Sequence, residues 1–70
     1  MGKQLKQSGS IIAIKFSSGE DVFHHKRIAD QLYESFMSEG NEYYFSYQDE
    51  QLIIHYQRAD VSRIVYLKEK

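Results

Sequence analysis

The fold of this 70-residue chain is decided by residues 26–39, which read KRIADQLYESFMSE. Apolar residues recur in this segment at the three- and four-residue spacing of one helix face. They form two adjacent rows, namely Ile28, Leu32 and Phe36, and Ala29, Tyr33 and Met37. Polar residues fill the other side, and Gly40 is a typical helix terminator. The pattern predicts an amphipathic helix with a broad apolar stripe.

The segment before this helix predicts a β-hairpin. Residues 11–16 are rich in β-branched side chains, which favour a strand, and Gly19 can supply the positive φ of a tight turn. Residues 20–24 would then form the return strand. Asp21 could instead cap an early helix. We prefer the strand, because the apolar residues of this segment do not extend the helical stripe.

Three further strands are predicted after the helix, at residues 42–47, 52–56 and 62–67, with polar turns between them. The element order is then β-β-α-β-β-β. One helix on one face of a mostly antiparallel sheet gives a two-layer α+β fold. Residues 1–10 are polar and without periodicity, so we expect a flexible leader followed by a single α+β domain over residues 11–70.

The predicted strands carry apolar side chains on both faces, whereas a sheet with one helix has only one covered face. Exposed apolar surface usually marks an interaction site. Alternation along the strands predicts an outer set that would form this interface: Tyr44, Ile53, Val65 and Leu67. A scatter of ordinary surface hydrophobes fits the pattern equally well. A register error of one residue would also invert the set.

The net charge of −1 conceals a segregated distribution. Residues 28–57 contain six carboxylates and no Lys or Arg, whereas cations dominate on both sides of this segment. An acidic middle repels a phosphate backbone, so nucleic acid is not the favoured partner. A weak single-stranded nucleic-acid-binding module nevertheless remains the alternative function. It would use sheet aromatics and nearby arginines: Tyr43, Tyr47, Arg58 and Arg63.

Groups that could carry chemistry are sparse. The chain has no Cys, and adjacent residues of a strand face opposite sides, so His24 and His25 are not expected to share a metal ion. No phosphate-binding glycine motif or nucleophile motif is present. We therefore expect neither an enzyme nor a cofactor.

The function that the sequence favours is a small, non-enzymatic protein-interaction domain. We expect it to self-associate as a homodimer through the uncovered sheet face, with Tyr and Ile side chains as anchors. No apolar run approaches the roughly 18 residues of a spanning helix. We accordingly expect a cytoplasmic protein with no membrane partner.

Overall fold

The computed structural model describes residues 9–38, 40 and 42–68. Its elements are β1 (Ile11–Phe16), β2 (Asp21–His25), α1 (Lys26–Met37), β3 (Tyr44–Gln48), β4 (Ile53–Gln57), the 3₁₀ turn η1 (Arg58–Asp60) and β5 (Val61–Leu67). The predicted α+β class and the order β-β-α-β-β-β are confirmed. Apart from its last two residues, the predicted leader lies outside the described residues.

The segment before the helix is a hairpin, so the strand interpretation of residues 20–24 is confirmed. Gly19 has a φ of 101° in the turn, as the hairpin requires. β2 then leads into α1 without a loop. Lys26, the first residue of the helix, has a φ of 60°, a left-handed conformation at the point where the chain passes from β2 into the helix.

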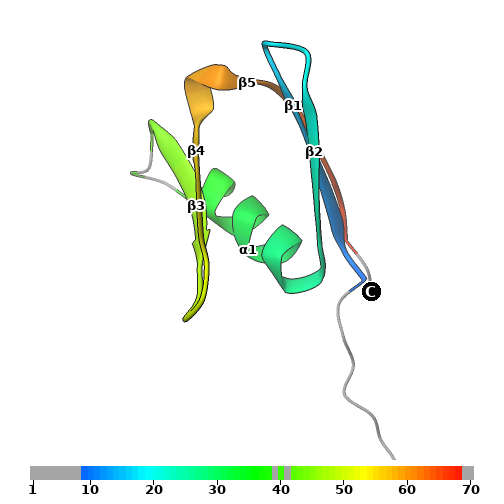
Figure 1. Ribbon diagram of the computed structural model, residues 1–70, viewed down its shortest axis with the longest axis vertical. Helices are drawn as coiled ribbons and strands as arrows, with labels where there is room; N and C mark the ends of the chain where they lie inside the picture. The colour runs from blue at the N-terminus through cyan, green and yellow to red at the C-terminus, as the bar shows by residue number, and fades with distance from the viewer. Residues whose placement is uncertain (1–8, 39, 41, 69–70) are drawn as a thin grey trace, which may run out of the picture.

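The five strands form two antiparallel sheets rather than one. One sheet has the order β2-β1-β5, and the other is the β3-β4 hairpin. Figure 1 shows α1 lying between the two sheets, with η1 connecting them at one end. The two apolar rows of the helix explain this arrangement. Tyr33 stacks on Tyr66 of β5 with ring centroids 4.1 Å apart, whereas Phe36 contacts Phe45 of β3 edge-on at 5.2 Å.

The core therefore receives side chains from all three layers. Its fully or almost fully buried members are Ile12, Ile14, Ala29, Leu32, Phe45 and Tyr47. At the end of the domain beside η1, the rings of Phe16 and Tyr56 close the core with centroids 5.4 Å apart. Each sheet thus buries one face against the helix and leaves its other face to the surroundings.

The helix ends at Met37, two residues before the predicted end of the pattern. Ser38 adopts an extended conformation with a ψ of 138°, and its N–H donates to the carbonyl of Ser35. Gly40 follows with a positive φ of 83°, so it acts in the connection to β3 and not in the helix terminus itself. Residue 39 lies outside the described residues.

Candidate interaction surface

The outer face of the β2-β1-β5 sheet carries a continuous group of apolar side chains. Ala13 of β1 is paired with Phe23 on one side and with Val65 on the other. Ile11, two residues away, is likewise paired with His25 and Leu67. Directly paired residues of antiparallel strands project to the same side of the sheet. We call the five apolar members the outer patch: Ile11, Ala13, Phe23, Val65 and Leu67.

The outer patch is accessible on its two edge strands. Phe23, Val65 and Leu67 are 59%, 44% and 62% exposed, whereas the central Ile11 and Ala13 are half-buried between them. The alternate residues of β1, Ile12 and Ile14, point to the other side and are completely buried, and those of β2 and β5 are partly buried. Alternation therefore separates a closed inner face from an open, apolar outer face.

A row of charged side chains borders the outer patch. Lys15 is paired with Asp21 on β2 and with Arg63 on β5, so these three residues share the outer face. The Lys15 Nζ lies 3.7 Å from Asp21 Oδ1. The negative charge thus lies on one edge strand, and the two positive charges lie on the central and opposite strands.

All four residues of the predicted outer set are exposed, but the structure divides them between the two sheets. Val65 and Leu67 belong to the outer patch. Tyr44 and Ile53, which are 41% and 66% exposed, lie on the hairpin across α1 from β5 (Figure 1). A single flat interface therefore cannot include all four. Phe23 was missing from the predicted outer set. Alternation along the predicted strand at residues 20–24 was the available signal, since it places Phe23 on the face opposite Val22 and His24.

The outer face of the hairpin is mostly polar. Tyr44 is paired with Gln57 at one end, and Ile53 is paired with Gln48 at the other. Between them lies a pair of polar residues, Ser46 and His55. The Tyr44 ring contacts the His55 ring at 4.4 Å and does not reach Ile53 along an apolar row. The hairpin thus presents separate apolar side chains rather than a patch.

The residues proposed for nucleic-acid contacts do not form one stacking platform. Tyr43 is exposed, but Tyr47 is buried in the core, where its hydroxyl donates to Asp49 Oδ2 at 2.7 Å. This hydrogen bond, together with burial, raises the pKa of Tyr47, and the same bond lowers the pKa of Asp49. Arg63 lies on the other sheet, beside the outer patch.

Arg58 is engaged within the molecule. Its guanidinium donates to the carbonyl oxygen of Phe36 near the end of α1, and its Cζ lies 4.5 Å from the centroid of the Phe36 ring. This combination is typical of an arginine that clamps a helix end. Since Tyr47 and Arg58 both serve the fold, the nucleic-acid alternative receives little support from the geometry.

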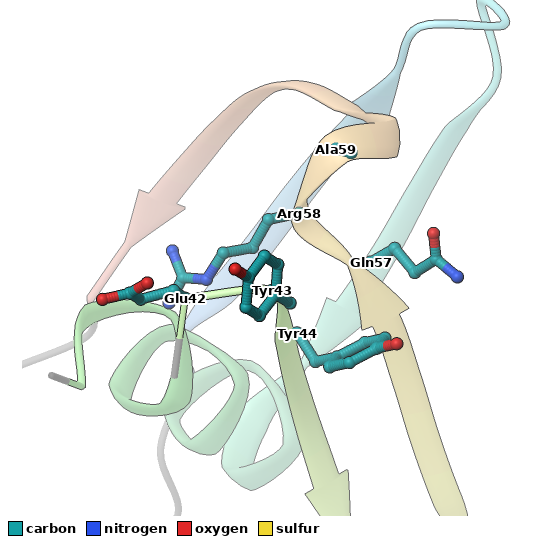
Figure 2. A pocket seen from close by; sticks show the side chains of 6 residues that line it. All are labelled: Glu42, Tyr43, Tyr44, Gln57, Arg58 and Ala59. Carbon is teal, nitrogen blue, oxygen red and sulfur yellow. The ribbon is translucent and has the colours of Figure 1, made fainter. Parts of the chain in front are cut away.

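A cavity of about 500 Å³ lies where β3 begins and β4 ends (Figure 2). Its lining residues are Glu42, Tyr43, Tyr44, Gln57, Arg58 and Ala59. Figure 2 shows that the Arg58 side chain extends toward α1, which agrees with its contact to Phe36. A ligand in this cavity would have to compete with α1 for the Arg58 guanidinium. The cavity therefore indicates no ligand class.

The three histidines lie on three separate surfaces. His24 faces inward, where its Nε2 and the hydroxyl of Tyr56 share a hydrogen bond of 2.7 Å. Burial, and to a smaller extent the neighbouring His25, lowers the pKa of His24. His25 lies on the outer face beside Ile11, and His55 lies on the hairpin. Within residues 9–38, 40 and 42–68, no three metal-binding side chains gather at one point.

Comparisons of the chain with protein-family models, curated proteins and solved structures found no significant match. Neither helical segment in the described part of the chain has the length and apolar content to cross a lipid bilayer.

Proposed function

We propose that this chain is a small, cytoplasmic, non-enzymatic protein-interaction domain that self-associates through the outer face of its β2-β1-β5 sheet. The observation that carries the proposal is the outer patch, in which apolar side chains occupy neighbouring positions on three adjacent strands. Contiguous apolar surface of this kind marks interaction sites more often than scattered hydrophobes do.

The size of the face sets the strength that we expect. With strands about 4.8 Å apart and about 3.3 Å per residue, the outer face measures roughly 15 Å by 17 Å. This is smaller than the roughly 800 Å² that each partner buries in a standard interface. The dimer should therefore be weak, with a Kd in the micromolar range or above, and should exchange rapidly.

The test is the molar mass of the full chain by sedimentation equilibrium between about 10 μM and 1 mM. We expect the mass to rise toward that of a dimer with concentration. Phe23→Ser should hold it at the monomer value, because the substitution removes the largest side chain of the outer patch. A wild-type chain that stays monomeric up to 1 mM would contradict the proposal.

Ile53→Ser is the matched control. Ile53 is as exposed as Leu67 and equally apolar, but it lies on the hairpin, outside the outer patch. The control variant should retain the wild-type concentration dependence. Dissociation by Ile53→Ser and not by Phe23→Ser would move the interface to the hairpin.

A further inference from the structure

The two edge strands of the outer face of the β2-β1-β5 sheet differ in charge and in side-chain size. Its three cross-strand rows are, in order, charged, apolar and mostly apolar: Asp21, Lys15 and Arg63; Phe23, Ala13 and Val65; His25, Ile11 and Leu67. In the first two rows, the edge strands differ in kind. β2 contributes the carboxylate and the large aromatic ring, and β5 contributes the guanidinium and the smaller valine.

A two-fold axis that lies in the interface and runs along β1 would exchange the two edge strands while it keeps the rows aligned. Asp21 of one copy would then lie opposite Arg63 of the other, and Phe23 would lie opposite Val65. Both pairs occur twice in such a dimer, because a two-fold interface is reciprocal. Lys15 lies on the axis and would face the Lys15 of the other copy. Asp21, whose Oδ1 lies 3.7 Å from the Lys15 Nζ, offsets part of this repulsion.

A two-fold axis perpendicular to the strands would instead place β2 over β2. It would set Phe23 against its own copy, and it would lay the charged row over the row that contains Ile11 and Leu67. Lys15 and Arg63 would then lose water against apolar side chains, which is costly for a charged group without a partner. Charge complementarity therefore favours the axis along β1.

We propose that the partner of the outer face is a second copy of this chain in this orientation, with its β1 parallel to the first. The contact between Asp21 of one copy and Arg63 of the other selects the arrangement. The inference rests on the proposed self-association and adds its geometry and its specificity-determining residues. Two sheets that pack face to face commonly keep their strand directions within about 30° of each other.

Two single charge reversals test the orientation by sedimentation equilibrium at low ionic strength. Asp21→Lys and Arg63→Glu each place like charges opposite one another twice, so each homodimer should be weaker than wild type by about five- to tenfold. An equimolar mixture of the two variants should recover dimerisation to within about twofold of wild type. In the mixed dimer, both contacts again join opposite charges.

The mixture is the decisive experiment, because a contact within one chain cannot explain recovery of dimerisation when the two variants are combined. A mixture that associates no better than the separate variants, while Phe23→Ser still dissociates the wild type, would overturn the orientation and leave the interface itself standing. A wild-type chain that remains monomeric up to 1 mM would overturn both. Circular dichroism of each variant, with an unchanged helix signal, confirms that the fold is intact.

Discussion

The two sheets hold the helix by different means. The β2-β1-β5 sheet is joined to α1 through the backbone, since β2 leads directly into the helix and the Lys26 N–H donates to the Ser10 carbonyl at 2.8 Å. The hairpin is held largely through side chains. Phe45 packs against Phe36, and the Ser46 N–H donates to Ser35 Oγ at 3.0 Å.

This difference explains which sheet has side chains that are not needed to hold the helix. A two-stranded hairpin is marginally stable alone, so β3 and β4 depend on side chains that must be kept for the fold. The three-stranded sheet has a central strand paired on both sides and a covalent connection to the helix. Its outer side chains are therefore not among those that hold the helix, as the proposed self-association requires.

The largest effect should come from removing the main anchor of the hairpin. Phe45 is completely buried, and Phe45→Ala should lower the free energy of unfolding by about 3–5 kcal/mol, a large part of the stability of a small domain. Denaturant unfolding followed by circular dichroism measures the loss. Tyr44→Ala, at the neighbouring exposed position, should cost no more than about 0.5 kcal/mol. Equal losses would mean that the hairpin is not anchored by its inner face.

Removing the contacts between Arg58 and the end of α1 should have the next largest effect. Arg58→Ala removes a charge-assisted hydrogen bond to the Phe36 carbonyl and a cation–π contact, so it should cost about 1–3 kcal/mol. Arg63→Ala is the matched control, because Arg63 lies on an exposed face, and should cost about 0.5 kcal/mol or less. The same denaturation assay at low protein concentration measures both losses. Similar values would mean that Arg58 stabilises the fold no more than an exposed arginine does.

At Lys26, where β2 leads into α1, a substitution should stabilise the protein. Lys26 has a φ of 60°, which costs a side-chain-bearing residue about 1–2 kcal/mol, whereas glycine adopts it freely. Lys26→Gly should therefore raise the free energy of unfolding by about 0.5–1 kcal/mol. Lys26→Ala removes the same charge but keeps the Cβ, so it should bring no gain. A gain with alanine as well would assign the effect to the lysine charge.

The elements could be predicted from the sequence because their patterns are local. The two apolar rows from Ile28 to Met37 identify the helix, and alternation sets the phase of each strand, which is why Val65 and Leu67 are found exposed as expected. The positive φ of Lys26 had no comparable signal. Lysine has no preference for this conformation, and the direct connection from β2 imposes it.

The division into two sheets could not be predicted, because alternation says nothing about which strands are neighbours. β5 follows β4 in the chain but pairs with β1, and this distant pairing brings Val65 beside Ala13 and Phe23. The same pairing leaves Ile53 on the other sheet. Membership of the outer patch therefore depends on topology, whereas exposure depends on local pattern.

The smallest effect should be a pH dependence at one of the contacts between the two sheets. His24 of β2 and Tyr56 of β4 share a hydrogen bond, and burial lowers the pKa of His24 in the folded chain. The unfolded chain takes up the proton near pH 6.5, whereas the folded chain takes it up only at lower pH. The free energy of unfolding should therefore decline as the pH falls below 6.5 and level off below the pKa of folded His24.

Denaturant unfolding between pH 7.5 and pH 5 at fixed ionic strength measures this decline. His24→Gln should remove most of it, because glutamine can bond to the Tyr56 hydroxyl but does not titrate. His55→Gln, which changes a histidine on the outer face of the hairpin, should leave the decline in place. An unchanged decline in His24→Gln would mean that other groups carry the pH dependence.

The pairing of Ile11 with Leu67 has a consequence for how this domain can be linked to other chains. The first and last strands of the described fold lie side by side, and both lead out of the domain at the same end (Figure 1). A unit with adjacent entry and exit points can be placed in a surface loop of another protein with little distortion of either. It can also be circularly permuted by a short bridge between residues 68 and 10.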